Sequence, residues 1–529
     1  MIEIKDLTHR FGKQLLFENV NLSLDRSHRY GLIGANGAGK STFLKILSGE
    51  VEHTSGEIAV DSGLKIGVLG QDQFAFEDFS LKDAVLYGNK RLYEAVKEKE
   101  KLYESAEFTD EINNRLAELE MISAEEDPTY EYEIRIEKIL SSLGLNEFDK
   151  KMSQAETSDK FKVLLAQVLF PKPDILFLDE PTNNLDIEAI SWLEYELNRH
   201  EGTLVVISHD RHFLNRVCTD ILDVDFRKIR KFSGNYDDWY IAANLLSRQA
   251  QMERDKQLKE KAELEKFIAR FSANASKAKQ ATSRQKLLEK LDISEIAVSS
   301  RRDPSILFKL GREIGNEILE LKGINKKFGD ITIFKDFDFK LEKSDKVAII
   351  GRNGVGKTTL CRMIVGEMGQ DSGTIHTGAT IESGYFAQDT NNKIKGDLKL
   401  YEYLQDNKNK DLDEIRKCLG RMLFSGAEQE KSVGALSGGE KHRVMLSKLM
   451  LTKPNFLVLD EPNNHLDLEA IIALGEALYN FAGSVICVSH DRELIDAFAN
   501  RILHLKGNGE VVDFRGSYEE YRASLGESD

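Results

Sequence analysis

The sequence predicts an α/β fold in which two similar domains are joined by an α-helical hairpin, and three observations predict it. The string GANGAGKST at 34–42 returns as GRNGVGKTT at 351–359. Each copy follows a short apolar stretch typical of a buried strand and precedes a helix-forming run. Between the two copies lies a long charged segment with helical periodicity. A chain of 529 residues is also too long for a single core.

Both strings match the phosphate-binding loop G-x-x-x-x-G-K-[ST]. In such a loop, backbone N–H groups surround the phosphates, the lysine reaches the β- and γ-phosphates, and the next hydroxyl binds Mg²⁺. The strings therefore predict ATP and Mg²⁺ as cofactors, bound at the N-terminus of a helix. The predicted nucleotide-binding residues are Gly34, Asn36, Gly37, Gly39, Lys40, Ser41 and Thr42, and Gly351, Asn353, Gly354, Gly356, Lys357, Thr358 and Thr359.

Carboxylates and histidines repeat in the same way. In each half an apolar strand ends in Asp-Glu, and a later strand is followed by Ser-His-Asp. The aspartate can hold the metal, the glutamate can polarise an attacking water, and the histidine can contact a γ-phosphate. A lone histidine is more often structural, and it is the repetition that favours function here. The predicted metal ligands are Asp179 and Asp460 with the loop hydroxyls Ser41 and Thr358, and the predicted catalytic residues are Glu180, Glu461, His209 and His490.

The two halves differ by an insertion. Lys40 and Lys357 are 317 residues apart, whereas Asp179 and Asp460 are 281 apart, so the first half carries 36 extra residues between these positions. The segment 92–138, with 15 acidic and 6 basic residues, is predicted to hold this insertion as two helices, with Pro128 near an end. It is either a solvated helical hairpin or a docking arm.

The connector between the halves is predicted to be a basic helical hairpin. Apolar residues at 264, 267, 268 and 271 have the spacing of an amphipathic helix of roughly thirty residues, which would be ~45 Å long. A turn is expected at 272–276 and a second helix at 277–291. From Lys266 to Lys290 there are seven basic residues and one acidic residue. This charge suits phosphate contact, and the alternative is a solvated coiled-coil face. The predicted RNA-binding residues are Arg270, Lys277, Lys279, Arg284, Lys286 and Lys290.

The predicted domains are therefore 1–239, 240–315 and 316–529. The net charge of −16 argues against a protein that coats nucleic acid over its whole surface. Four cysteines without C-x-x-C spacing indicate reduced structural thiols. The sequence has no apolar run of the ~20 residues that a membrane span needs, and its start lacks an apolar signal-peptide core. We therefore expect a cytoplasmic protein with no membrane partner.

The string LSGGE at 436–440, together with DEPxNxLD, resembles the signature of ATP-binding cassette (ABC) ATPases, and the resemblance covers both halves. It implies that the two cassettes of one monomer close head to tail over two ATP molecules, each held by the phosphate loop of one half and the signature of the other. By this resemblance Ser437, Gly438, Gly439 and Glu440 contact ATP, and Phe11 and Phe328 stack on adenine. Gln71 and Gln388 are by the same resemblance the Q-loop glutamines, which contact the nucleotide and serve as further metal ligands. For the two phenylalanines, ordinary core packing is the alternative.

The first half departs from this signature. Residues 155–159 (AETSD) lie opposite LSGGE, or 152–155 (MSQA) if the gap is moved, and neither contains a pair of glycines. Glu156 would place a carboxylate where Ser437 offers a hydroxyl. Like charges ~4 Å apart cost about 1 kcal/mol even in water. We therefore expect unequal sites, in which the site formed by the Lys357 loop supports closure less well.

Two fused cassettes without a membrane segment, joined by a long basic helical connector, are similar to the ABC-F family, and most closely to its bacterial translational members. This resemblance implies that the protein binds the 70S-type ribosome, regulates translation, and contacts tRNA and rRNA through the connector. Ribosome protection against antibiotics, which uses the same machinery, is one alternative. A transporter motor is a second. A coiled-coil DNA-repair ATPase fits less well, because its coiled coil interrupts a single cassette.

Overall fold

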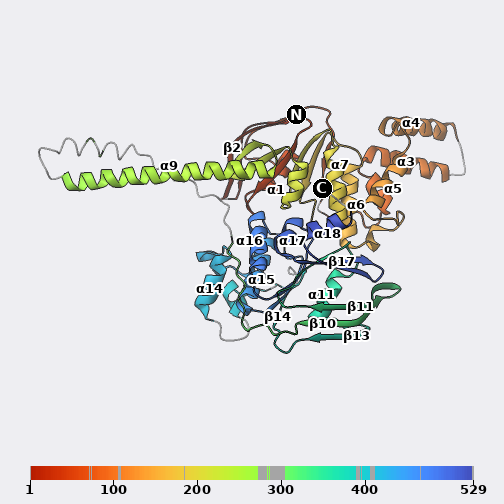
Figure 1. The fold of residues 1–529 in the computed structure, drawn as a ribbon. Helices are drawn as coiled ribbons and strands as arrows, with labels where there is room; N and C mark the ends of the chain where they lie inside the picture. The colour runs from red at the N-terminus through yellow and green to blue at the C-terminus, as the bar shows by residue number, and fades with distance from the viewer. Residues whose placement is uncertain are drawn as a thin grey trace.

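The computed structural model describes residues 2–12, 14–70, 72, 74–104, 109–183, 185–271, 283, 285, 304–388, 394, 396–405, 411–464 and 466–526. Two similar α/β halves pack against each other, a helical arm extends from one side, and a long helix extends from the opposite side (Figure 1). Within the described residues, each half contains a six-stranded sheet and a three-stranded antiparallel sheet. The predicted fold class is thus confirmed.

The sheets of the first half are ordered β5-β6-β7-β3-β8-β9 and β2-β1-β4. Their strands are β1 (Ile2–Phe11), β2 (Gln14–Leu24), β3 (Arg29–Gly34), β4 (Ser55–Val60), β5 (Ile66–Val68), β6 (Ile175–Asp179), β7 (Thr203–Ile207), β8 (Asp220–Asp225) and β9 (Lys228–Ser233). The helices outside the arm and the connector are α1 (Lys40–Leu47), α2 (Leu81–Leu86), α5 (Tyr132–Ser142), α6 (Thr157–Leu169), α7 (Ile187–Asn198) and α8 (Arg211–Val217).

The second half repeats this plan, with the orders β14-β15-β16-β12-β17-β18 and β11-β10-β13. Its strands are β10 (Leu319–Phe328), β11 (Ile331–Leu341), β12 (Lys346–Ile350), β13 (Ser372–Thr377), β14 (Ser383–Phe386), β15 (Phe456–Asp460), β16 (Ser484–Val488), β17 (Arg501–Gly507) and β18 (Glu510–Arg515). Its helices are α11 (Lys357–Ile364), α13 (Leu400–Gln405), α14 (Leu412–Arg421), α15 (Gly438–Thr452), α16 (Leu468–Tyr479), α17 (Arg492–Phe498) and α18 (Tyr518–Ser524).

The central strands of both large sheets are parallel, and their burial explains their sequences. All five residues of β7, β12, β15 and β16 are buried, as expected for strands covered on both faces. β3 lies between β7 and β8, and β12 lies between β16 and β17, all in parallel. The carboxyl ends of these strands therefore meet at one edge of each sheet, where ligands bind in open α/β sheets.

The insertion forms the arm, which consists of two helices, α3 (Lys90–Glu104) and α4 (Asp110–Glu126). α5 follows the arm and belongs to the body, because Ile136 and Leu140 are buried in the core of the first half. α3 and α4 pack against each other, and ion pairs join Arg115 to Glu98 and Lys99 to Glu120 across them. Pro128 follows the end of α4, as expected. The acidic side chains thus hold the arm together in part, and many remain exposed.

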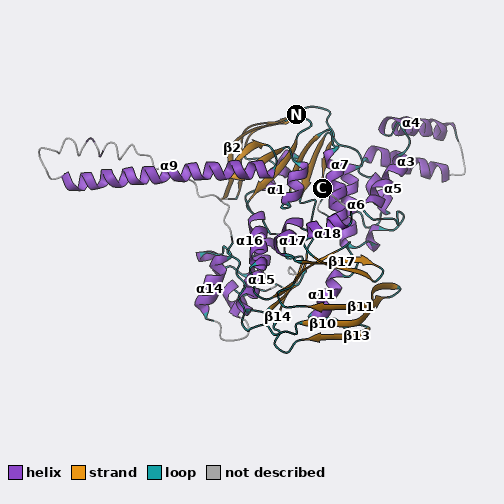
Figure 2. Cartoon of the chain, viewed as in Figure 1, coloured by secondary structure: helices purple, strands orange, loops and turns teal. Residues whose placement is uncertain are grey.

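The connector begins with α9 (Tyr236–Phe271), a helix of 36 residues rather than the expected thirty or so. It starts inside the first half, because Tyr236 and Trp239 are buried in that half's core, and it crosses the predicted boundary at 239/240 without a break. Figure 2 shows the outer part of α9 projecting from the body, away from the described strands. The predicted turn at 272–276 and most of the predicted second helix lie outside the described residues. None of the described helices is long and apolar enough to cross a membrane.

The two halves exchange apolar side chains reciprocally. Leu468, at the start of α16, is buried in the core of the first half, and Ile187, at the start of α7, packs against the core of the second half. These two residues are 281 positions apart, so they are equivalent in the repeat. The interface therefore has approximate two-fold symmetry, with each half inserting the segment that follows its Asp-Glu strand into the other.

Candidate functional site

Each phosphate loop joins a central strand to a helix that begins at the predicted lysine. β3 leads to α1, which starts at Lys40, and β12 leads to α11, which starts at Lys357. The residue before each lysine is glycine in the left-handed region, with φ of 100° at Gly39 and 108° at Gly356. A Cβ on Gly356 would lie 2.2 Å from the side chain of Ile333, so only glycine fits this turn.

The two lysines are buried and turned toward their own loops. The Nζ of Lys40 donates to the carbonyl of Gly34 at 2.7 Å, and the Nζ of Lys357 donates to the carbonyl of Gly351 at 2.7 Å. Burial lowers the pKa of Lys40, and it lowers the pKa of Lys357 to about 8. A cradle of backbone N–H groups with a desolvated ammonium group suits a polyphosphate, whose charge would offset the cost of burial.

The predicted metal site is best defined in the second half. Asp460 ends β15 and is fully buried, and neither of its carboxylate oxygens has a well-formed hydrogen bond among the described residues. Burial, followed by the charge of Glu461, raises the pKa of Asp460 to about 6, while the hydroxyl of Thr358 nearby opposes this shift. A buried carboxylate beside a hydroxyl fits Mg²⁺, which takes few protein ligands and completes its shell with phosphate oxygens and water.

The predicted catalytic glutamates and histidines meet in both halves. The Nε2 of His209 lies 3.3 Å from Oε1 of Glu180, and the Nε2 of His490 lies 3.7 Å from Oε1 of Glu461. Both glutamates have positive φ, 52° and 49°, a conformation that costs energy in residues other than glycine and concentrates at functional sites. Burial raises the pKa of Glu180 to about 7, and it lowers the pKa of both histidines well below the usual value.

Glu461 also accepts two hydrogen bonds from neighbouring amides. Gln388 donates from Nε2 to Oε2 of Glu461 at 2.8 Å, and Asn464 donates to the same oxygen at 2.8 Å. Gln388 is thus beside the predicted catalytic carboxylate, whereas Gln71 lies outside the described residues. Asn464 is not among the predicted site residues, although Asn183 occupies the equivalent position in the repeated DEPxNxLD string.

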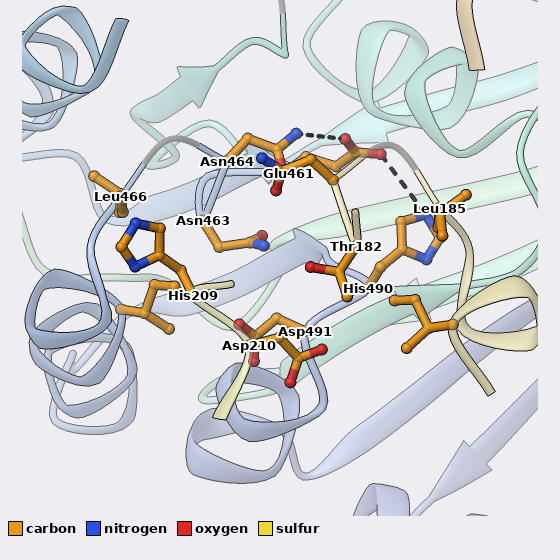
Figure 3. Close-up of a pocket in the computed structure, with 13 residues that line it drawn as sticks. Thr182, Leu185, His209, Asp210, Glu461, Asn463, Asn464, Leu466, His490 and Asp491 are labelled. Atoms are coloured by element: carbon orange, nitrogen blue, oxygen red, sulfur yellow. Dashed lines mark hydrogen bonds and ion pairs between the residues drawn. The ribbon is translucent and has the colours of Figure 1, made fainter. Parts of the chain in front are cut away.

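Residues of both halves line a shared cavity on the approximate two-fold axis (Figure 3). His209 and Asp210 approach it from the first half, and Glu461, His490 and Asp491 approach it from the second half. The residues predicted to act at separate ATP sites therefore lie around one interface. This arrangement is what a head-to-tail closure of the two halves requires.

The second half's phosphate loop faces the first half directly. The backbone N–H of Asn353 points to Oδ2 of Asp186 at 3.5 Å, and Arg352 donates from Nε to Glu188 at 2.7 Å. The Nζ of Lys162, a residue that the sequence analysis missed, lies 3.1 Å from Oδ2 of Asp186, and both side chains are buried. A buried cation and carboxylate thus bridge α6 to the loop of the opposite half.

The register of the degenerate signature is decided by the helix starts. Ser437 is the N-cap of α15 and forms a capping box with Glu440. Glu156 is the N-cap of α6, where its side chain makes no capping hydrogen bond within the described structure. Glu156 is therefore opposite Ser437, as in the first of the two alignments. The Oε2 of Glu156 lies 3.9 Å from the point where a Cβ on Gly354 would stand, so its carboxylate faces the second phosphate loop.

The remaining predicted residues divide into two groups. Phe11 and Phe328, at the ends of β1 and β10, are 75% and 47% exposed, so neither belongs to the core. Arg270 is in the last turn of α9, and its side chain is not among the described ones. The other predicted RNA-binding residues lie outside the described residues; these are Lys277, Lys279, Arg284, Lys286 and Lys290.

Comparison with known proteins agrees with this geometry. A protein-family model described as ABC transporter matches residues 17–183 and 334–464, and a second model with the same description matches 222–308. The chain is 47% identical to the uncharacterized ABC transporter ATP-binding protein YkpA of Bacillus subtilis, over 98% of this chain and 97% of that protein. It is 43% identical to the probable ATP-binding protein YbiT of Escherichia coli O157:H7, over 99% and 100% of the two chains.

A third relative has a name that states a role. The chain is 33% identical to the energy-dependent translational throttle protein EttA of Escherichia coli K12, over 97% of this chain and 94% of that one. Among solved structures, the archaeal ribosome recycling factor aABCE1, in complex with the ribosomal stalk protein aP1, matches with a TM-score of 0.62 at 18% identity, covering 98% of this chain and 92% of that chain. At this identity the structural match supports the fold alone.

Two phosphate loops, two Asp-Glu strand ends, and His209 and His490 around one interface define a tandem ATP-binding cassette ATPase. This class of protein binds and hydrolyses ATP. The similarity to YkpA, YbiT and EttA covers more than the two cassettes, because it runs through both halves and the connector. The chain belongs to the ABC-F family of these ATPases.

Proposed function

We propose that this ATPase acts on the ribosome, and that closing of its two halves over two ATP molecules directs the basic connector toward tRNA or rRNA and so regulates translation. In this proposal the protein is a cytoplasmic monomer, whose two halves form the paired sites within one chain. The name of EttA, a translational throttle protein, supports the proposal by relationship.

The observation that carries it is the position of the long helix. α9 starts in the core of the first half, and Tyr236 and Trp239 in its first turns line a cavity together with Gly34, His209 and Leu468. The base of α9 therefore lies around one cavity with the first phosphate loop, His209 and a residue of the opposite half. Its 36 residues extend about 54 Å, at 1.5 Å per residue. In this proposal, a movement of the two halves at the ATP interface therefore changes the direction of α9.

Mg²⁺ would be held by Asp179 and Ser41 in one site and by Asp460 and Thr358 in the other, where it would neutralise charge on the β- and γ-phosphates. The chain's own groups do the rest. Glu180 and Glu461 accept a proton from, and orient, the attacking water, and His209 and His490 hold the γ-phosphate in line. The interface between the halves excludes bulk water from these groups.

The test is capture on ribosomes. Replacing both glutamates, Glu180→Gln and Glu461→Gln, retains binding of ATP but removes the group that activates water. The closed form should then persist, and the variant should co-sediment with ribosomes in ATP at least about tenfold more than the unmodified protein. The control replaces both lysines, Lys40→Ala and Lys357→Ala, and should not be retained. Equal recovery of the two double variants would contradict the proposal.

A further inference from the structure

Two arginines outside the predicted sites cross the interface in opposite directions. Arg211 and Arg492 follow His209 and His490 by two positions, begin α8 and α17, and are 281 residues apart. We use the term histidine loops for residues 208–212 and 489–493. Each arginine is therefore rigidly attached, through the first turn of a helix, to a histidine that is predicted to contact a γ-phosphate.

Arg211 reaches from the first half to the second. Its Nη1 lies 2.7 Å from Oε1 of Glu493, the residue that follows Arg492. The rest of its guanidinium group is held on its own half, because Nε donates to Asp237 at 2.8 Å and the rings of Tyr236 and Tyr240 lie 5.7 and 5.9 Å away. Only one end of the planar guanidinium group is thus presented to the opposite half.

Arg492 makes the reciprocal contact. Its Nη2 donates to Oγ of Ser191 at 2.7 Å, and its Nη1 lies 3.3 Å from Nε2 of His212, the residue that follows Arg211. The imidazole of His212 in turn lies 3.3 Å from the buried carboxylate of Glu194. Arg492 is only 8% exposed, so solvent screens this contact weakly. Each histidine loop is therefore bonded to the other one at two points.

The contacts also offset a repulsion on the axis. Asp210 and Asp491, which cap α8 and α17, lie close together between the two loops (Figure 3). Burial raises the pKa of both carboxyl groups, and the charge of Asp210 raises that of Asp491 further, whereas Arg492 and His212 lower that of Asp210. When both groups are ionised, their repulsion pushes the loops apart, and the guanidinium group of Arg492 from the opposite half reduces this repulsion at Asp210.

We propose that Arg211 and Arg492 are positioning residues that link the two histidine loops, so that the state of one ATP site changes the turnover of the other. The inference rests on the proposed pair of ATP sites and is independent of the ribosome. A rearrangement at His209 moves Arg211 and, through Glu493, the loop that carries His490. The reverse path runs from Arg492 to His212. Such a link supplies a coupling free energy between sites without any shared ligand.

The experiment measures coupling by blocking one site in the full-length protein without ribosomes. In the parent, Glu461→Gln should lower total ATP turnover by about tenfold, although it blocks only one of two sites. In a background with Glu493→Ala and Arg492→Gln, the same substitution should lower turnover by at most about twofold, because Glu461 belongs to the less active of two sites that are then independent. A tenfold loss in both backgrounds, or a twofold loss in the parent, would overturn the proposal.

A control and a milder variant keep the test decisive. Arg115→Ala removes a similar arginine–glutamate pair on the arm and should leave the tenfold factor unchanged. If the combined variant unfolds early in a thermal melt, Glu493→Gln alone, which keeps the shape and removes the charge, should reduce the factor at least about threefold. An unchanged factor in that variant counts against the link. Failure of ribosome capture would leave this result unaffected, because no ribosome is present.

Discussion

At the residue scale, the site is a group of ionisable side chains that are buried together. Burial raises the pKa of Glu180 to about 7 and lowers that of Lys357 to about 8, so both are shifted toward neutral pH. Such shifts arise because water is excluded from charged groups, and they gather where a charged ligand is to be bound. The residue types were predictable from the repeated strings, whereas the shifts depend on packing across the interface.

Glu180 should make the unliganded protein less stable as the pH rises. Its pKa in the folded state is above its ordinary value of 4.5, so its contribution is fully favourable below pH 4.5 and is lost as the pH passes about 7. Glu180→Gln removes this loss. The difference in the free energy of unfolding, variant minus parent, should therefore be about 2–3 kcal/mol larger at pH 8.5 than at pH 4.5. Thermal or urea unfolding of both proteins at the two pH values measures this. A constant difference between them would contradict the burial of this carboxylate.

At the scale of elements, the two helices that begin with the signature are unequal. α15 begins with a serine capping box, and two glycines follow the serine. The N-cap of α6 is Glu156, whose carboxylate faces the opposite phosphate loop. Lys162 contributes a buried cation nearby, but it is already paired with Asp186. The second site therefore meets a less favourable helix N-terminus than the first.

Restoring the serine should improve the second site. In a Lys40→Ala background, where the first site is disabled, Glu156→Ser should strengthen ATP binding by about 1 kcal/mol, or about fivefold, because it removes a like charge at ~4 Å. Equilibrium binding of a fluorescent ATP analogue at low and high salt measures this. Glu118→Ser, at an exposed acidic position on the arm, is the matched control and should change nothing. A gain in the control of the same size would show a general charge effect instead.

At the scale of the whole molecule, closure is held by two kinds of contact. Leu468 and Ile187 exchange between cores, and ion pairs such as Arg211–Glu493 and Arg352–Glu188 surround them. The charged groups of these ion pairs are shielded from water in part by the opposite half. ATP bound between the halves would therefore contribute part of the free energy that keeps them together.

ATP should make the molecule measurably more compact. With hydrolysis blocked by Glu180→Gln and Glu461→Gln, small-angle X-ray scattering should show a smaller radius of gyration in saturating ATP than without nucleotide, because ATP stabilises the closed form. Lys40→Ala with Lys357→Ala should show no such change. If the blocked variant scatters identically with and without ATP, nucleotide does not drive closure.

The sequence alone determined the two-domain α/β fold, both phosphate loops, the strand-end carboxylates and histidines, and the acidic arm, because each is encoded by residues that are neighbours along the chain or by a constant repeat offset. Only the tertiary structure decided which residue replaces Ser437, where α9 begins, and that Lys162, Arg211 and Arg492 belong to the interface. These depend on segments that are far apart in sequence and meet only when the two halves pack, and no local pattern records such a meeting.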